Sequence, residues 1–484
     1  MFELIVRQPV DAEVVVLGAG PAGAAAAIHL ARAGVDVLLV DRRSFPRDKI
    51  CGDFVSHTAL LELADLGLAE TNDIARAVAI SSAAVHLDGE PLIARGLPVG
   101  PDVPHLGRVI PRMQLDVCLV EAAARAGARI IEGANVKSVE HRGSHLELEV
   151  AGRARRTLKT RLVVGADGSN SLAARFVRGG QPSRRDRIIA VRAYYDNVGD
   201  RPNEVDLFFT RETFPGYTWV FPLGGGLANV GVGMVQVTVP PQDEHLRHML
   251  ARIIERDPAV RSRLSGASPA SKVVGWPLST YNPRAPVLAD GLLLVGDAAG
   301  LINPLNGEGI QYALASGRWA AETVVSSGGD YSSERLAPYA ARLDRELRLD
   351  MTLARMIVQG ISNRSLNALW LQILRAITLR ASTDADYAAT AGGILAGLVP
   401  ASEASSRRFL NATVAEARGL TTNVSGRQMS AGAARTALAW TGALARHPIG
   451  TTAWSFEASR AVADFVREAT RAESALRKAG AMSA

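Results

Sequence analysis

The stretch Glu13-Val-Val-Val-Leu-Gly18-Ala-Gly20-Pro-Ala-Gly23 decides the fold, because it joins a short apolar run to a glycine-rich turn and then to a helix. The aliphatic residues before Gly18 are typical of a buried parallel strand. Gly18 allows a tight turn, Gly20 lets backbone N–H groups approach a pyrophosphate, and Gly23 lets the helix pack close to the strand. The N-terminus of that helix carries a partial positive charge that favours a diphosphate.

A second apolar strand, residues 37–40, supports this interpretation. It ends in Asp41, at about the 20-residue distance where a carboxylate meets a ribose hydroxyl in dinucleotide-binding folds. A lone G-x-G-x-x-G is a weak indication, since glycine-rich turns are common. Here a strand precedes the glycines, a helix follows them and an acid ends the next strand. The chain is therefore predicted to begin with a dinucleotide site.

Two further strand ends carry the same kind of motif. Asp167-Gly168 follows the apolar run 161–165, and Gly296-Asp297 follows the run 291–295. The carboxyl ends of parallel strands meet at one edge of a doubly wound sheet, so these motifs can converge on one long ligand. A dinucleotide that carries its own redox ring explains three distant motifs better than NAD alone.

The charge and composition of the chain limit the classes of molecule that it is expected to bind. The chain of 484 residues is long enough for two or three packed units, and its formal charge is +6. Residues 341–484 hold 18 Lys and Arg against 11 Asp and Glu, a surplus of 18 − 11 = 7. This surplus indicates a solvated helical surface or an anionic partner such as phospholipid headgroups, a prenyl diphosphate or a carrier protein. The basic residues are scattered and accompany no recognition motif, which argues against nucleic acid.

The cysteine count and the hydropathy pattern indicate the cellular compartment of the protein. Only Cys51 and Cys118 are present, so a disulfide scaffold and a cysteine-cluster metal site are both excluded, and no other metal-ligand spacing is found. The N-terminus lacks a signal pattern, and no apolar run reaches the roughly 18 residues that span a bilayer. We expect a cytoplasmic protein that is soluble or at most peripheral to a membrane. No pattern indicates an oligomeric state.

The period of the hydrophobic residues changes along the chain. A hairpin signal at Asp88-Gly89 and alternating strands between residues 188 and 237 predict an antiparallel sheet, and the chain beyond residue 328 reads as helical. The predicted fold class is α/β, with a discontinuous Rossmann-type domain, an antiparallel substrate sheet and a C-terminal helical region. The predicted boundaries are 1–79, 105–182 and 279–328 for the nucleotide-binding parts, 80–104 and 183–278 for the sheet, and 329–484 for the helices.

With these motifs the sequence resembles the FAD-binding fold of the p-hydroxybenzoate hydroxylase superfamily and, within it, the geranylgeranyl reductase family. The likeness spans residues 13 to about 325. It is carried by Phe45-Pro46-Arg47-Asp48-Lys49-Ile50-Cys51-Gly52, by Pro215-Gly216-Tyr217-Thr218-Trp219-Val220-Phe221-Pro222, and by Gly296-Asp297-Ala298-Ala299-Gly300 continuing to Gly307-Glu308-Gly309-Ile310.

The resemblance implies FAD as the cofactor and assigns roles to named residues. Arg112 is expected near the flavin diphosphate, Asp297 near the ribityl chain or diphosphate, and the Gly307–Ile310 backbone against the isoalloxazine. Asp167-Gly168 matches a motif associated with FAD and with a transient nicotinamide cofactor. The residues expected to bind cofactor are Gly18, Gly20, Gly23, Asp41, Arg42, Cys51, Arg112, Asp167, Gly168, Gly296, Asp297, Pro304, Gly307, Gly309 and Ile310. No second G-x-G-x-x-G is present, so an NADPH donor would bind without a domain of its own.

The resemblance leaves three chemistries open for a long hydrophobic substrate, an isoprenoid or a polyene. In a reductase, flavin N5 delivers hydride to an alkene carbon and Cys51 or Tyr217 protonates its neighbour, while Trp219 and Phe221 line the substrate pocket. In a monooxygenase of natural-product biosynthesis, reduced flavin traps O₂ in a dry pocket. In a non-redox cyclase, bound FAD only shapes the pocket. Fold analogy does not decide among them, and we expect the reductase.

The C-terminal helices have two interpretations. An apolar stripe around Trp370 predicts a cap that packs over the substrate sheet and closes the tunnel. Alternatively, this stripe and the basic segment 456–478 could rest on a membrane surface.

Overall fold

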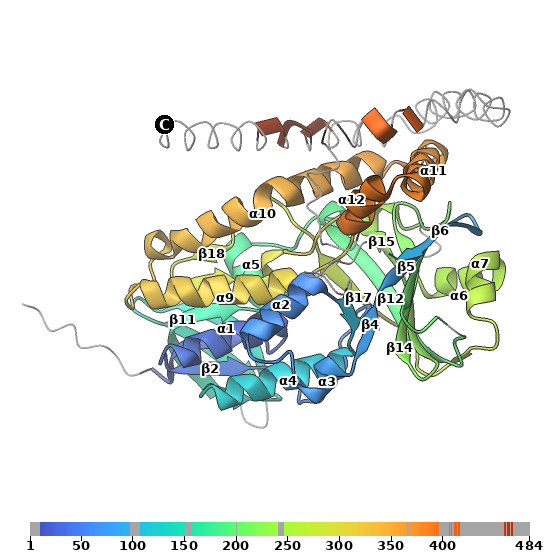
Figure 1. The fold of residues 1–484 in the computed structure, drawn as a ribbon. Coiled ribbons are helices and arrows are strands. Elements are labelled where there is room, and N and C mark those ends of the chain that lie inside the picture. Colours follow the sequence, from blue (N-terminus) through green and yellow to red (C-terminus); the bar gives the residue numbers. More distant parts are fainter. Residues whose placement is uncertain are drawn as a thin grey trace, which may run out of the picture.

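The computed structural model shows two sheets side by side, with helix α10 (Ser333–Ile361) crossing above the first and leading to helices over the second (Figure 1). It describes residues 10–96, 107–151, 156–199, 201–240, 246–364 and 367–395, and scattered residues within 406–416 and 459–467. The basic segment 456–478 lies largely outside the described residues.

Mostly parallel strands form the first sheet, in the order β18-β19-β11-β1-β2-β8. β1 pairs in parallel with β11 on one side and with β2 on the other, and β11 pairs in parallel with β19. The strands that precede the glycine and aspartate motifs are therefore neighbours, which confirms the predicted convergence at one sheet edge. The strands are β1 (Ala12–Leu17), β2 (Val37–Val40), β8 (Arg129–Ile131), β9 (Asn135–His141), β10 (Leu146–Ala151), β11 (Arg156–Gly165), β18 (Leu288–Ala289) and β19 (Leu292–Leu294).

Helix α1 (Pro21–Arg32) is rich in alanine because it packs on several sides at once. It contacts β1, helix α4 and helix α9, and its alanines 24–27 are all buried. Gly317 in α9 makes the close helix approach possible, since a Cβ there would lie 2.3 Å from the carbonyl oxygen of Ala22. The helices of this part are α2 (His57–Asp65), α3 (Asn72–Ala75), α4 (Arg112–Arg125), α5 (Leu172–Arg178), α8 (Gly296–Ala299) and α9 (Ile310–Ser326).

The second sheet has the order β16-β12-β15-β14-β13-β5-β6, and β17 pairs with β12. Its pairs are antiparallel except β13 with β5, which is parallel and joins the β5–β6 hairpin to a distant part of the chain. Its elements are β5 (Ser82–Leu87), β6 (Glu90–Gly96), β12 (Arg187–Asp196), β13 (Glu204–Phe209), β14 (Tyr217–Gly224), β15 (Leu227–Val235), β16 (Ser268–Pro269), β17 (Val274–Ser279), α6 (Arg247–Arg256) and α7 (Pro258–Arg263).

A small third sheet and the C-terminal helices complete the fold. β3 (Phe54–Ser56), β7 (Gly107–Val109) and β4 (Val78–Ile80) link the two larger sheets, and helices α11 (Asn367–Thr383) and α12 (Ala385–Leu395) follow α10. Leu371 of α11 packs in one apolar cluster with Phe209 of β13 and with Phe214 in the turn between β13 and β14. This packing agrees with a cap over the substrate sheet. Within the described ranges, no helix is both long enough and apolar enough to cross a membrane.

Gly23 provides a test of the packing at the glycine turn. A Cβ at this position would lie 1.9 Å from the carbonyl oxygen of Gly18, a backbone atom that cannot move aside. We expect Gly23→Ala to lower the free energy of unfolding by on the order of 3 kcal/mol, measured by urea denaturation. Gly180→Ala is the matched control, because a Cβ there meets nothing within 4 Å. Equal stability of the two variants would contradict this packing.

Candidate active site

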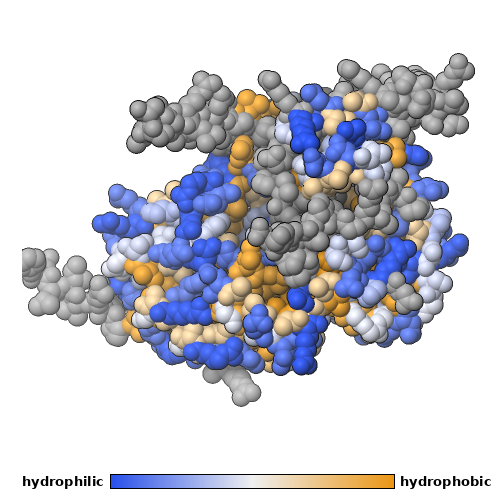
Figure 2. Space-filling model, viewed as in Figure 1, coloured by the Kyte–Doolittle hydropathy of each residue, from blue (hydrophilic) through white to orange (hydrophobic). Residues whose placement is uncertain are grey.

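A cavity of about 740 Å³ lies between the two sheets and continues to the C-terminal helices. Apolar residues gather around the middle of the molecular face shown in Figure 2. At one end the cavity reaches the glycine turn at Gly20, and at the other it reaches Ile394 of α12. Of the predicted site residues, those that line it are Gly20, Cys51, Arg112, Gly168, Tyr217, Trp219, Phe221, Asp297, Pro304, Gly307, Gly309 and Ile310.

Two arginines face the glycine turn. Arg112 makes a bidentate pair with Asp116, with Nε to Oδ1 at 2.7 Å and Nη2 to Oδ2 at 2.8 Å, and Arg47 Nη1 lies 3.0 Å from Asp116 Oδ2. Burial opposes the charged form of Arg112, but Asp116 outweighs it and raises the pKa of Arg112. A Cβ on Gly20 would point between these guanidiniums, 3.8 Å from one and 3.9 Å from the other. Because Gly20 has no side chain, the space between the two guanidiniums stays open and suits a diphosphate. We call Gly20, Arg47 and Arg112 the arginine cradle.

Two of the predicted strand-end carboxylates, Asp41 and Asp167, accept hydrogen bonds from the protein itself. Asp41 accepts hydrogen bonds from the backbone N–H groups of Ala19 (2.9 Å) and Arg43 (2.8 Å), so it fixes the glycine turn itself. Asp167 accepts from Ser171 Oγ and from the N–H groups of Leu172 and Ala173, which caps helix α5. Neither carboxylate lines the cavity.

Four other predicted cofactor residues, Gly18, Gly23, Gly296 and Arg42, also lie outside the cavity lining. Gly18 and Gly296 have positive φ (99° and 55°) and pack against the backbone of Ala166 and the side chain of Ala22. Arg42 is exposed, and its guanidinium lies 5.7 Å above the ring of Trp276. These glycines shape the turns behind the cavity, and a direct ligand contact for Arg42 stays a prediction.

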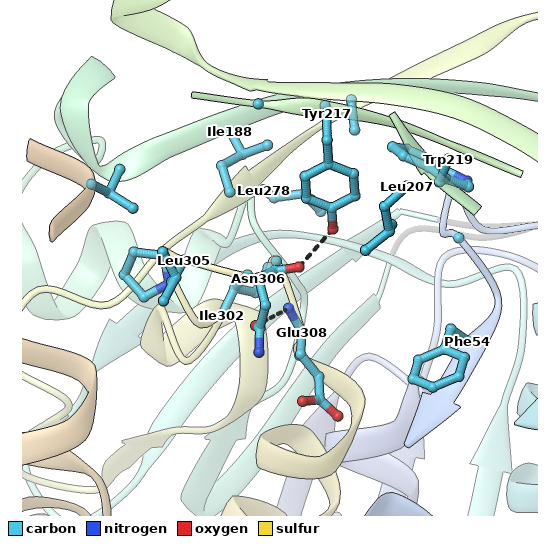
Figure 3. A pocket seen from close by; sticks show the side chains of 18 of the residues that line it. Phe54, Ile188, Leu207, Tyr217, Trp219, Leu278, Ile302, Leu305, Asn306 and Glu308 are labelled. Atoms are coloured by element: carbon cyan, nitrogen blue, oxygen red, sulfur yellow. Dashed lines mark hydrogen bonds between the residues drawn. The ribbon is translucent and has the colours of Figure 1, made fainter. Parts of the chain in front are cut away.

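The loop before α9 forms the floor of the central cavity. Asn306 holds it in two ways: its Oδ1 accepts from the Glu308 N–H at 3.0 Å, and its carbonyl accepts from the Tyr217 hydroxyl at 2.7 Å (Figure 3). Gly307 has a φ of 75°, a left-handed conformation that brings the backbone under Tyr217. The loop backbone thus faces the substrate sheet, and its contact with the isoalloxazine stays a prediction.

The aromatic strand β14 forms the opposite wall. The rings of Tyr217, Trp219 and Phe221 follow one another at centroid distances of 6.2 and 6.1 Å. The Trp219 indole lies across Gly231 of β15, where a Cβ would approach Cζ2 to 2.2 Å. A glycine on the neighbouring strand therefore makes room for the indole in the wall.

Protonation states near the cavity are set mainly by burial. Burial raises the pKa of the Cys51 thiol, and it raises that of Tyr217 to about 12. Both groups thus keep their protons at neutral pH. Burial also raises the pKa of Glu308 to about 7, and it lowers the pKa of Lys49. The Tyr217 proton is donated to the Asn306 carbonyl, so Tyr217 is a poor acid toward a substrate.

Sequence reasoning missed several polar residues around the cavity. Asp116 is one of them, and the i and i+4 spacing of Arg112 and Asp116 is the sequence signal for their ion pair. Asp53 and Asn229 hold cavity-lining residues in place, and Glu308 lines the cavity. Their roles depend on contacts between distant segments, which no local pattern contains.

The site suits a ligand that has an anionic group in its middle and a flat ring at one end. The apolar part of the cavity beside the ring would take a hydrocarbon chain. The residues present therefore fit FAD: Gly20, Arg112 and Arg47 would hold its diphosphate, and the Asn303–Ile310 loop would lie beside its ring. No group of three or more His, Cys, Asp or Glu within the described ranges is placed to hold a metal ion.

Comparison with known proteins agrees with this fit. The family described as FAD binding domain matches residues 11–317. The menaquinone reductase of Mycolicibacterium smegmatis is 34% identical over 405 residues, covering 78% of this chain and 94% of that protein. The digeranylgeranylglycerophospholipid reductase 2 of Methanopyrus kandleri is 33% identical over 377 residues, covering 74% and 89%.

Two solved structures share the fold. A geranylgeranyl bacteriochlorophyll reductase-like protein from Thermoplasma acidophilum matches with a TM-score of 0.65 and 23% identity, over 84% of this chain and 98% of that one. A halogenase in complex with phloroglucinol and FAD matches with a TM-score of 0.61 and 16% identity, over 88% and 96%. The fold is thus one on which flavoproteins of different chemistry are built.

The arginine cradle yields a test by FAD binding. Arg112→Lys keeps the charge but loses the bidentate pair with Asp116, so we expect FAD to bind roughly tenfold more weakly, about 1.4 kcal/mol. Affinity is measured by flavin fluorescence after removal and return of FAD. Arg125→Lys is the control, since Arg125 lies exposed on the same helix with its side chain 62% accessible. Unchanged affinity in Arg112→Lys would contradict the cradle.

Proposed function

The chain belongs to the FAD binding domain family and, within it, to the geranylgeranyl reductase group, and we propose that it saturates a carbon–carbon double bond in a long isoprenoid substrate. It is an FAD-dependent oxidoreductase. The observation that carries the proposal is the continuous apolar cavity, which runs from the loop that faces the flavin position to the last described helix.

The far end of the cavity suits a linear hydrocarbon chain. Helices α11 and α12 line it mainly with aliphatic side chains and alanines, together with Trp370 and with Thr378, whose hydroxyl donates to the Arg375 carbonyl of its own helix. These residues are Trp370, Ile373, Leu374, Ile377, Thr378, Ala381, Ala385, Ala388, Ala391 and Ile394. The names of the similar reductases, which refer to menaquinone and to digeranylgeranylglycerophospholipid, support an isoprenoid substrate.

The residues of this chain would orient the substrate, exclude water and supply a proton. Reduced FAD supplies a hydride, and alkene reduction then needs one proton on the neighbouring carbon. Cys51 lines the cavity and holds a proton at Sγ because burial raises its pKa. Figure 3 shows the Glu308 carboxyl pointing away from Tyr217, which favours Cys51 as the donor.

Anaerobic flavin spectroscopy tests the function. The purified holoprotein is reduced with NADPH, or with dithionite if NADPH fails, and an isoprenoid alkene is added without oxygen. We expect the flavin to reoxidise and the product to gain two hydrogens. Substrate-dependent O₂ uptake with oxygenated product would instead indicate a monooxygenase. Turnover with oxidised flavin and no donor would indicate a cyclase. NADPH as donor is part of this proposal, and failure of NADPH alone would remove only that part.

Cys51→Ala tests the proton donor. Loss of a general acid slows a reaction by about 10²–10⁴-fold, so alkene-dependent flavin reoxidation should fall within that range while reoxidation by O₂ stays unchanged. Stopped-flow absorbance measures both rates. Cys118→Ala is the control, because Cys118 contacts Asp73 and does not line the cavity. An unchanged alkene rate would remove Cys51 from the mechanism and direct attention to Glu308.

Ala388→Trp tests the depth of the substrate site. The indole would fill the cavity near α12, so we expect KM for a long prenyl substrate to rise about tenfold or more, with KM for a short one unchanged. Ala389→Trp on the same helix is the control, since Ala389 does not line the cavity. Equal effects on long and short chains would place the substrate tail elsewhere.

A further inference from the structure

Asp53 occupies an unusual position behind the cavity wall. Its side chain is 0% exposed, and its φ of 63° lies in the left-handed region that non-glycine residues seldom adopt. It directly follows Cys51 and Gly52, which line the cavity, but it does not line the cavity itself. A charged residue in a strained conformation, buried beside the site, needs a specific reason.

The carboxylate joins the cofactor-side loop to two strands of the second sheet. Asp53 Oδ2 accepts hydrogen bonds from the Tyr194 hydroxyl on β12 and from Asn229 Nδ2 on β15, each at 2.8 Å. The same Asn229 nitrogen donates to the carbonyl oxygen of Cys51 at 2.8 Å. Asp53 therefore reaches the Cys51 backbone both through the chain and through Asn229.

The orientation of Asn229 follows from its other neighbour. The Trp219 indole N–H can only donate, and it lies 3.0 Å from Asn229 Oδ1. The amide nitrogen of Asn229 must then face Asp53 and the Cys51 carbonyl. An acceptor at Asp53 completes this set of bonds, which holds the Cys51–Gly52 segment against the Trp219 indole of β14.

We propose that Asp53 is a positioning residue whose charge state sets the geometry of the active-site cavity, acting through Asn229 on the Cys51 backbone and on the Trp219 indole. The carboxylate form accepts strongly from Asn229 and keeps the Cys51–Gly52 segment and the Trp219 indole fixed. The neutral acid accepts weakly and loosens them. The inference rests on the proposed function only in taking this cavity as the substrate site.

The surroundings of Asp53 allow this change of charge near physiological pH. Burial raises its pKa to about 6, against the opposing effects of the hydrogen bonds from Tyr194 and Asn229 and the charges of Arg192 and Arg112. Oδ1 is buried and has no hydrogen-bond partner, so it is the oxygen that takes the proton. The carboxylate form dominates at pH 7 and the acid below pH 6.

The direction of the pKa shift of Asp53 distinguishes a functional role of this residue from a purely structural one. Because the folded-state pKa of Asp53 lies above its unfolded value, its contribution to stability is present at low pH and is lost as pH rises through about 4 to 6. At neutral pH the ionised carboxylate is thus a cost to folding. We expect Asp53→Asn, which keeps an acceptor and tolerates the left-handed backbone, to be at least as stable as wild type at pH 7.5.

The test is a pH titration of the FAD-loaded protein, followed by visible circular dichroism of the bound flavin between pH 5 and pH 8. Wild type should show a transition with a midpoint near 6, and Asp53→Asn should lose it. Tyr194→Phe removes a hydrogen bond to the carboxylate, so its midpoint should move upward by about one pH unit.

Other titrating groups near the site require controls. Cys51 and Tyr194 both have a pKa raised by burial and keep their protons in this range, but Glu308 titrates near 7. Glu308→Gln should therefore retain the transition near 6. A transition that persists unchanged in Asp53→Asn, or that is absent from wild type, would overturn the proposal. The readout is the flavin spectrum, so it holds whether or not the protein reduces alkenes.

Discussion

Parallel pairing of β1 with strands on both sides is the constraint on which the rest of the molecule depends. Because β1 lies between β11 and β2, and β19 follows β11, the turns after these strands all open at one sheet edge. Gly18 and Gly23 keep the helix close enough to the sheet for this arrangement. The second sheet faces that edge, and the cavity between the two sheets therefore has the glycine turn and Arg112 at one end and apolar side chains at the other.

Local sequence patterns were sufficient for much of this fold. Buried strands, glycine turns and amphipathic helices are determined within ten to twenty residues, so the strand 37–40 and the hairpin at Asp88-Gly89 could be predicted directly. The aromatic alternation of Tyr217 and its neighbours correctly placed a strand with one face toward the cavity. The parallel pair of β5 with β13 could not be predicted, because it joins segments that no local signal connects.

The polar architecture of the site was less accessible to sequence reasoning. Asp167 ends a buried strand as a ligand-binding carboxylate would, yet its oxygens are used to cap a helix that begins a few residues later. Tyr217 carries a hydroxyl proton, but it donates this proton to the backbone carbonyl of Asn306, 89 residues further along the chain. The pairing of Arg47 with Asp116 likewise depends on how the loop after β2 folds back over α4.

The indole of Trp219 covers Gly231 on the adjacent strand, and this pairing has a consequence for how the pocket can diversify. A smaller residue at 219 would uncover bare backbone and leave a void, while a larger one at 231 would collide with the ring. A change in size at either position alone is therefore unfavourable. Enlarging this region for a bulkier substrate would require both residues to change together, so divergence of substrate size among such enzymes should proceed more readily from the helical end of the pocket.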